Sequence, residues 1–344
     1  MSAPIGGTAL VARLDNAGDV LLAGPAVRAV AAHVDKLVML TGPHGTAAAK
    51  LLPGVDHLIE WCAPWIDPYP EPVTAEHVTT LHDAVRAQAP DAALLLTSFH
   101  QSALPLALLL RLGGVGWIGA ISEDYPGSLL DLRHRVDGDP PEAQRALGLA
   151  RAAGYSLPAG DDGRLRVRGP LPDVRHLTAG PGYVVMHPGA SVPAREWPAQ
   201  HCAQTVRALT AAGYRVLVTG SATEAQLTAE VAGSTGVDLG GQTDLRALAA
   251  VLARACVVVA GNTGPAHLAA AVGTPVVSLF APVVPAARWA PFGVPTVLLG
   301  DQHAPCKDTR ARHCPVPGHP CLSGVGPADV VDAVGSLAGA GAPS

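Results

Sequence analysis

The sequence predicts an α/β protein of two doubly wound, Rossmann-like domains that face a cleft. Its 344 residues are about twice the length of a typical domain. Short apolar runs alternate with Ala-rich segments of helical period, a pattern typical of parallel sheets covered by helices on both faces. A Gly- and Pro-rich segment, Pro158–Pro181, interrupts this alternation. We therefore place the domains at 1–175 and 176–344.

In the first domain, apolar runs bounded by Gly, Pro or polar residues predict buried strands at 8–14, 37–41, 55–59, 92–97 and 115–118. Helices are expected between them at 20–34, 45–52, 74–89 and 104–112. Thr74 is the expected N-cap of the third of these helices, because its hydroxyl can accept a hydrogen bond from a first-turn amide.

The same alternation predicts the second domain, with strands at 183–187, 214–219, 257–260, 276–280 and 296–299. Helices are expected at 198–212, 223–232, 244–253 and 265–272. A last helix at about 327–338 is expected to pack back on the first domain. Ligands of such sheets bind beyond the carboxyl ends of the strands, so the turns that follow strands are the first place to look for a site.

Composition excludes several classes of protein. Aromatic residues make up 4% and the formal net charge is −5, which argues against a nucleic-acid binder. No apolar run approaches the roughly 18 residues of a membrane span, and the first residues lack the pattern of a signal peptide. Six cysteines in a chain of this length do not form a disulfide scaffold. We expect a reduced, cytoplasmic protein, a monomer, without a membrane span.

Three further motifs are weak. Gly114–Gly119 matches GxGxxG, but it overlaps a predicted strand and opens no helix, so a dinucleotide site is disfavoured. Asp137-Gly138-Asp139 is interpreted as a solvated turn rather than a holder of a metal diphosphate. Cys306, Cys314 and Cys321 lie among histidines, but their wide spacing favours a Pro-rich structural loop over zinc. No metal or cofactor is expected.

One turn of the second domain is suited to an anion. Gly261–His267 follows an apolar strand, with Thr263 placed to cap the next helix and Pro265 in its first turn. Backbone amides and the dipole at a helix N-terminus favour a group such as a diphosphate, which His267 could hydrogen-bond. The alternative is an ordinary tight turn with a packed histidine.

Two other strand-to-helix turns carry reactive side chains. In His187–Pro198, Ser191 and Arg195 offer a hydroxyl and a charged fork to phosphate, unless Arg195 is an ordinary surface arginine. In Leu14–Val20, Gly18 is expected to permit a tight turn that puts Asp19 at a helix start, as a general base or merely as an N-cap. Together the three turns suit transfer of a group from a diphosphate donor to an acceptor hydroxyl.

These segments resemble glycosyltransferase family 9, the ADP-heptose:lipopolysaccharide heptosyltransferases. The matching segments are AGDVLLAGPAVRAV, HPGASVPAREWP and NTGPAHLAAAVGTPVVSLFAP, and the Cys306–Cys321 loop resembles that of the heptosyltransferase II branch. The resemblance implies a GT-B fold and an inverting, metal-independent transfer in which an ADP-sugar is a co-substrate. It assigns the base to Asp19 and diphosphate contacts to Ser191, Arg195, Thr263, Gly264 and His267.

The resemblance also assigns Glu224 to the ribose and Thr243 to the adenine. Two positions depart from the family pattern. Arg195 stands where lysine is common, which keeps the charge, and Asn262 stands where some members have aspartate, which removes a carboxylate from the donor site.

The distribution of charge bears on the acceptor. Residues 1–170, nearly all of the domain expected to bind the acceptor, hold 13 basic and 18 acidic residues, whereas residues 171–344 hold ten of each. We expect a neutral or cationic acceptor, such as an amino sugar or aminocyclitol in natural-product biosynthesis, near Asn16, Glu123 and Asp124. A basic patch around Arg133 and Arg135 would instead suit lipopolysaccharide or another cell-envelope glycan. A non-catalytic sugar-nucleotide-binding protein and a GT-B epimerase are the alternatives of other classes.

Overall fold

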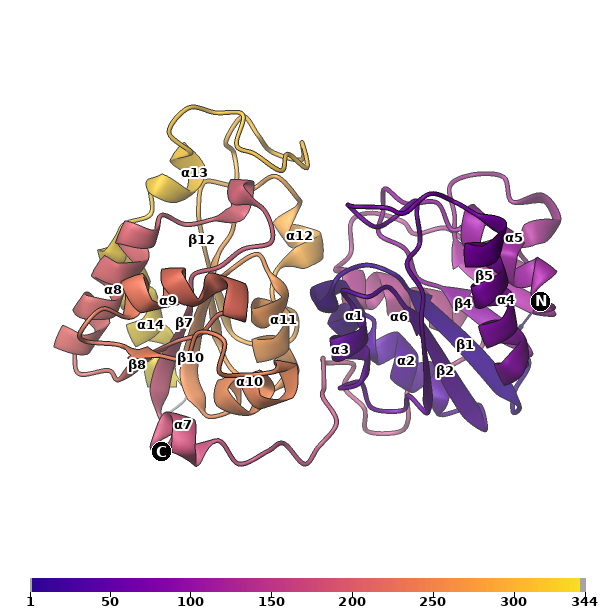
Figure 1. Cartoon of the computed structure of the whole chain (residues 1–344), viewed down its shortest axis with the longest axis horizontal. Helices are drawn as coiled ribbons and strands as arrows, with labels where there is room; N and C mark the ends of the chain where they lie inside the picture. The colour runs from indigo at the N-terminus through magenta and orange to yellow at the C-terminus, as the bar shows by residue number, and fades with distance from the viewer. Residues whose placement is uncertain (1, 341–344) are drawn as a thin grey trace. The chain divides into compact units, whose positions relative to one another are not determined.

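The computed structural model describes residues 2–340 and divides the chain into two compact units, Met1–Arg168 and Gly169–Ser344. Each unit contains a six-stranded parallel sheet with helices on both faces (Figure 1). The predicted class, two doubly wound α/β domains, is confirmed. The division falls inside the Gly- and Pro-rich segment that sequence patterning indicates as a linker.

The first sheet has the order β3-β2-β1-β4-β5-β6. Its strands are β1 (Thr8–Arg13), β2 (Lys36–Thr41), β3 (His57–Glu60), β4 (Ala92–Leu95), β5 (Trp117–Ile121) and β6 (Leu132–His134). Its helices are α1 (Ala17–Leu22), α2 (Gly24–Ala31), α3 (Thr46–Ala49), α4 (Ala75–Gln88), α5 (Leu104–Leu112) and α6 (Glu142–Ala152), with a short 3₁₀ turn η1 (Gly127–Leu129). Helices α1, α2, α3 and α6 pack together on one face, and α4 and α5 on the other (Figure 1).

Alternation along the strands builds the core of this domain. Leu10 and Ala12 of β1 point to the face that α4 and α5 cover, where they join Leu81, Val85 and Leu106 in one buried apolar cluster. Successive strand residues point to opposite faces, so a strand covered on both sides reads as a continuous apolar run. This explains why the central strands are visible in the sequence.

The second sheet repeats the topology with the order β12-β11-β10-β7-β8-β9. Its strands are β7 (Tyr183–His187), β8 (Val216–Val218), β9 (Val237–Asp238), β10 (Ala255–Gly261), β11 (Val276–Leu279) and β12 (Thr296–Leu299). Its helices are α7 (Arg175–Thr178), α8 (Ala199–Ala211), α9 (Ala225–Ala232), α10 (Leu245–Leu252), α11 (Gly264–Ala271), α12 (Ala286–Trp289), α13 (Pro320–Ser323) and α14 (Pro327–Ala340), with 3₁₀ turns η2 (Pro193–Arg195) and η3 (Ala222–Glu224).

Helix α14 packs on α8 and on strands β10, β11 and β12 of its own domain, where Val330 and Val334 are fully buried. Its expected return to the first domain stays a prediction. Within residues 2–340, no helix is both long enough and apolar enough to cross a membrane.

Several local expectations can be compared with the structure. Thr74 is confirmed as the N-cap of α4, since the His77 amide donates to its hydroxyl over 3.1 Å.

The single helix expected at 20–34 is wrong: α1 ends at Leu22 and α2 begins at Gly24, because Pro25 has no N–H to continue the helical bonding. Residues Gly114–Gly116 lead into strand β5 and not into a helix, which confirms that the GxGxxG motif lacks a dinucleotide-binding context.

Candidate active site

The predicted donor residues gather at one edge of the second sheet. They follow four adjacent strands at their carboxyl ends: Ser191 and Arg195 follow β7, Glu224 follows β8, Thr243 follows β9, and Asn262, Thr263, Gly264 and His267 follow β10. Strand order reverses between β7 and β10, which is the place where open α/β sheets bind ligands. The sheet therefore brings the donor candidates together, while their individual roles stay predictions.

The acceptor-side candidates lie at the corresponding edge of the first sheet. Asn16 and Asp19 follow β1, and the exposed Glu123 and Asp124 follow β5, with β4 between these two strands. Here the strand order reverses between β1 and β4. Asp19 therefore lies beside the switch point of its domain.

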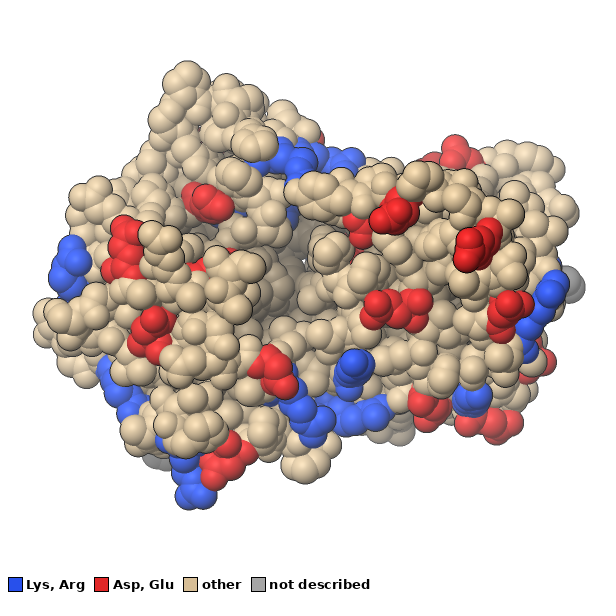
Figure 2. Space-filling model, in the orientation of Figure 1, with Lys and Arg blue, Asp and Glu red and all other residues tan. Residues whose placement is uncertain are grey.

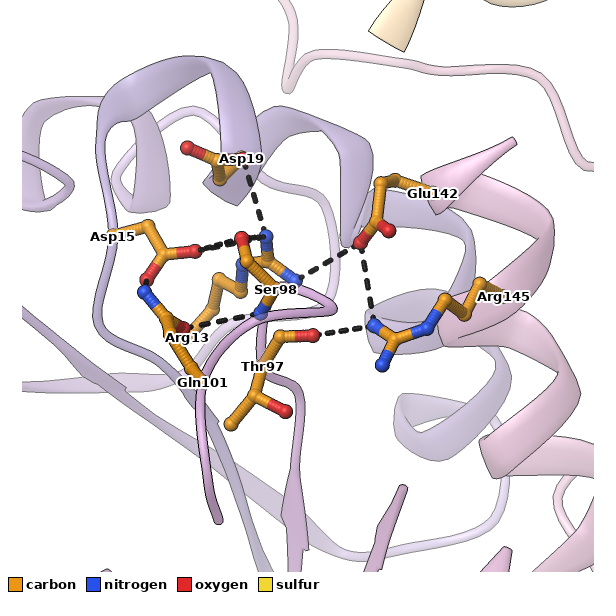
Figure 3. A network of polar contacts seen from close by, with 8 residues as sticks. All are labelled: Arg13, Asp15, Asp19, Thr97, Ser98, Gln101, Glu142 and Arg145. Atoms are coloured by element: carbon orange, nitrogen blue, oxygen red, sulfur yellow. Dashed lines mark hydrogen bonds and ion pairs between the residues drawn. The ribbon is translucent and has the colours of Figure 1, made fainter. Parts of the chain in front are cut away.

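Arg13, the last residue of β1, is the centre of a polar network at this switch point (Figure 3). Its Nη2 lies 2.8 Å from the Ser98 hydroxyl, 2.9 Å from Asp15 Oδ2 and 3.1 Å from Asp19 Oδ1. Its Nη1 lies 3.5 Å from Glu142 Oε2. Ser98 follows β4, the strand that pairs with β1, so the parallel register brings it beside Arg13.

A second layer of contacts fixes the partners of Arg13. Asp15 accepts from the Ser98 hydroxyl at 2.7 Å and from the Gln101 amide at 2.8 Å. Glu142 lies 3.4 Å from Arg145 Nη1, and Arg145 also donates to the Thr97 carbonyl. These contacts join β1, the segment after β4 and helix α6 into one buried unit.

Exposure distinguishes Asp19 from the other two carboxylates of the network. The side chains of Asp15 and Glu142 are 5% and 1% exposed, whereas that of Asp19 is 18% exposed. Burial disfavours the charged form of Arg13, but Asp15, Asp19 and Glu142 together raise the pKa of Arg13 above its usual value. Asp19 is thus the carboxylate of this network that a ligand can reach.

The local fold corrects two expectations about Asp19. Helix α1 begins at Ala17 with Asn16 as its N-cap residue, so Asp19 lies in the first turn and is not the cap. Gly18 lies inside the helix rather than in a tight turn before it. The reading of Asp19 as a mere N-cap is therefore wrong, and its side chain turns instead toward Arg13 (Figure 3).

His267 lies in the first turns of α11 and is 4% exposed. Burial, with a further effect from the nearby Arg195 charge, lowers the pKa of His267 to about 4. Among the described residues, its Nδ1 has no hydrogen-bond partner. At neutral pH this imidazole is uncharged, so it can offer a hydrogen bond to a diphosphate but no charge, and Arg195 is the cation beside it.

The α11 terminus differs in one detail from expectation. Thr263 is the N-cap residue and Pro265 lies in the first turn, as predicted, but the Thr263 side chain makes no capping hydrogen bond within the described structure. Thr263 therefore occupies the N-cap position without itself satisfying a first-turn amide.

Glu224 is held by the turn that follows β8. Its Oε2 accepts from the Ser221 amide at 2.7 Å, which is one half of a capping box whose other half is the Glu224 amide donating to the Ser221 side chain. The Ser221 hydroxyl also donates to Glu224 Oε2 at 2.8 Å. Glu224 also lies against Gly189 of the turn after β7, where an added Cβ would come within 1.9 Å of Glu224 Oε1. Glycine at position 189 is therefore needed for Glu224 to lie beside the donor turn.

The Cys-containing loop supports the turn that carries Arg195. The Ala194 amide donates to the Arg312 carbonyl at 3.0 Å, and His319 Nε2 donates to the Ala194 carbonyl at 3.1 Å. Trp197 Nε1 lies 3.1 Å from the Leu322 carbonyl and 3.2 Å from that of Val325. These bonds tie residues 194–197 to the segment 312–325.

The cysteines of this loop are free thiols. Cys306 and Cys321 are buried, and burial together with its contact to Cys306 raises the pKa of the Cys321 thiol to about 12. No group of three or more His, Cys, Asp or Glu side chains is placed to hold a metal ion within residues 2–340. The observed contacts of the loop are structural ones.

Sequence patterning missed most of the network around Asp19, namely Arg13, Asp15, Ser98, Gln101, Glu142 and Arg145. Only Arg13 carried a signal, as a charge that ends the otherwise apolar strand TALVAR. Its partner Ser98 is 85 positions away in the sequence, and no local pattern connects them.

Comparison with known proteins identifies the family of this chain. Three solved structures share the fold: the glycosyl transferase family 9 protein from Veillonella parvula DSM 2008 (TM-score 0.76, 16% identity, 96% of this chain and 97% of that one), the E. coli ADP-heptose lps heptosyltransferase II (0.73, 18%, 96% and 98%), and E. coli heptosyltransferase WaaC with ADP (0.67, 19%, 96% and 98%). No curated protein sequence matches the chain. The sequence model of glycosyltransferase family 9 (heptosyltransferase) matches residues 78–319, more than half of the chain. The chain therefore belongs to glycosyltransferase family 9.

Proposed function

We propose that this glycosyltransferase moves a heptose-type sugar from an ADP-sugar to an acceptor hydroxyl, with inversion and without a metal ion. The observation that carries the proposal is the accessible Asp19 carboxylate at the end of an otherwise buried charge network. The donor class is supported by family membership and by the similar WaaC structures, which were determined with ADP and with ADP-2-deoxy-2-fluoro heptose.

In the proposed reaction, Asp19 accepts the proton of the acceptor hydroxyl as its oxygen attacks the anomeric carbon. The bond from that carbon to the β-phosphate oxygen breaks, and its electron pair leaves with ADP. A single displacement of this kind inverts the anomeric configuration. Arg195 and the amides at the start of α11 would stabilise the charge that builds on the diphosphate, with His267 as a neutral hydrogen-bond donor.

We also propose that the acceptor is neutral or cationic. The loops after β3, β5 and β6 present exposed acidic side chains, namely Glu71, Glu123, Asp124, Asp137 and Asp139. In the described residues of these three loops, the exposed Lys or Arg is Arg135. The half-buried Arg133 donates from its guanidinium to the Ser122 and Glu123 carbonyls, which places its charge beside the exposed Glu123. In Figure 2 acidic side chains are spread over the visible face of this domain. An amino sugar or aminocyclitol hydroxyl fits this surface, which would repel an anionic glycolipid.

The catalytic proposal is tested by Asp19→Asn, with Asp83→Asn on the exposed side of α4 as the matched control. We expect Asp19→Asn to slow transfer by about 10²- to 10⁴-fold, the usual contribution of a general base, with ADP affinity unchanged. Asp83→Asn should have wild-type turnover. Equal turnover in Asp19→Asn and wild type would end the assignment of the base.

The acceptor is tested with purified enzyme, ADP-heptose and two acceptors, an aminoglycoside-like cation and an anionic glycolipid. We expect ADP release only when the cationic acceptor is present, and a higher KM for it in Glu123→Gln/Asp124→Asn. Activity on the anionic glycolipid alone would refute the acceptor class but keep the transferase. Acceptor-independent ADP release, or none under any condition, would favour an epimerase or a binding protein instead.

A further inference from the structure

We infer that Arg13 is the positioning residue of this enzyme's base: its guanidinium holds the Asp19 carboxylate ionised and in one orientation, and the buried Glu142, paired with Arg145, holds Arg13. The inference rests on the proposed role of Asp19 as the base. It assigns a function to a buried arginine that neither donor nor acceptor needs to touch.

The geometry of the guanidinium supports this role. A single nitrogen, Nη2, is within 3.1 Å of oxygens on Ser98, Asp15 and Asp19, and Nη1 faces Glu142 from the other side. Arginine presents its donors in a rigid planar fork, so partners on several sides fix the plane of the group. The buried partners, Asp15 and Glu142, are themselves anchored by Gln101 and Arg145. The Arg13 donor that faces Asp19 therefore has a fixed position.

Charge gives the second argument. In the network of Figure 3, Arg13 of β1 contacts Asp19, while Asp15 of the following loop and Glu142 of α6 contact the same guanidinium. Arg145 of α6 lies beyond Glu142. Helix α3, which also packs on α1, carries no charged residue, and Arg28 of α2 is paired with Asp161 instead. Fully ionised, the network holds three carboxylates and two guanidinium groups, an excess of one negative charge. Uptake of one proton by Asp19 makes it neutral.

Removal of Arg13 changes this balance. Within this network the three carboxylates would then be left with one guanidinium, that of Arg145, and like charges at short range oppose ionisation of all three. Asp19 is the most exposed of them and the one open to solvent protons. A lysine at position 13 would restore the charge, but its single ammonium cannot reproduce the contacts that both guanidinium nitrogens make.

The test compares the pH dependence of kcat/KM in wild type, Arg13→Gln, Arg13→Lys and a control, Arg28→Gln. Arg28 is also buried in this domain and forms a two-point contact with Asp161 at 2.6 and 2.9 Å, so its loss is a comparable structural perturbation. ADP affinity, which is assigned to the other domain, and thermal unfolding check the fold of each variant.

In Arg13→Gln we expect kcat/KM at pH 7 to fall about 100-fold, with the acidic limb of the profile moved up by one pH unit or more. Arg13→Lys should keep the limb within half a unit of wild type and lose about 10-fold in kcat. Arg28→Gln should keep the wild-type limb even if it lowers the melting temperature. If Arg13→Gln does not fold, the lysine variant alone decides: a wild-type kcat there overturns the inference.

An acidic limb that stays in place in Arg13→Gln, or moves equally in Arg28→Gln, would also overturn it. Failure of the underlying proposal has a different signature. Wild-type turnover in Asp19→Asn would refute the assignment of Asp19 as the base. An inactive Asp19→Asn together with an unmoved acidic limb in Arg13→Gln would refute only the role of Arg13.

Discussion

The hydrogen bonds of Trp197 make a prediction whose size follows from the structure. Its indole is 4% exposed and donates to the carbonyls of Leu322 and Val325. In Trp197→Phe the aromatic ring remains and the donor is lost. The Leu322 carbonyl still accepts from the Val325 amide at 3.0 Å, so the Val325 carbonyl bears most of the loss.

One buried acceptor left without its partner costs about 1–3 kcal/mol. For a unit of the size of this domain, each kcal/mol lowers the melting temperature by about 2–4 °C, so a decrease of roughly 2–12 °C is expected. Because Trp197 lies two residues after Arg195, in the turn that the 312–325 segment supports, ADP affinity should fall as well.

The matched control is Trp117→Phe in β5. Trp117 is also buried, at 7% exposed, but within residues 2–340 its indole nitrogen has no hydrogen-bond partner. The same substitution there removes ring volume and no hydrogen bond, so it should be milder and leave ADP affinity unchanged. Differential scanning calorimetry and ADP titration of both variants give the comparison. A Trp117→Phe variant that is destabilised as strongly as Trp197→Phe would refute the reasoning.

Two further predictions concern the proposed donor site in the second domain. The pKa of His267 is about 4 in the folded domain and 6.5 as its ordinary value, so the unfolded chain takes up the proton first and the free energy of unfolding falls as the pH drops from 6.5 to 4. His267→Gln should remove up to about 3 kcal/mol of this pH dependence, measured by urea unfolding. A free energy of unfolding that depends on pH as in wild type would contradict the burial argument. Gly189→Ala places a Cβ 1.9 Å from Glu224 Oε1 and should weaken ADP binding. The control, Gly335→Ala in α14, adds a Cβ that meets nothing within 4 Å, so it should bind ADP normally and gain about 0.4–1 kcal/mol in stability. Equal ADP affinities in the two variants would contradict a role of Gly189 in the proposed donor site.

Sequence patterning predicted what depends on local periodicity. Central strands such as β1 and β10 are covered on both faces and therefore appear as apolar runs. The edge strands β6 and β9 were missed, because they are three and two residues long and only partly buried or exposed. The break between α1 and α2 was visible as Gly24-Pro25, but helical periodicity on both sides of it favoured one continuous helix.

The residues of the candidate site likewise differ in whether local sequence patterns reveal them. The donor turn after β10 carries its signal within seven consecutive residues, so it can be read without a structure. The network of Arg13 joins β1, the segment after β4 and α6, and its members are ordinary polar residues at unremarkable places in the sequence. The parallel pairing of β1 with β4 brings Ser98 beside Arg13, and the packing of α6 on α1 and α2 adds Glu142 and Arg145. The closeness of Gly189 and Glu224 likewise depends on the adjacency of β7 and β8.

The two domains share one strand order, yet their switch points carry opposite chemistry. At the first, the carboxylates outnumber the guanidinium groups, and the accessible member is a carboxylate. At the second, Arg195 lies beside a histidine that burial keeps neutral. Uptake of a proton removes an excess negative charge, which suits a base, whereas a cation beside a neutral hydrogen-bond donor suits a departing diphosphate. Buried neighbours set both properties, so the same topology can accommodate the proposed proton acceptor in one domain and the proposed anion site in the other.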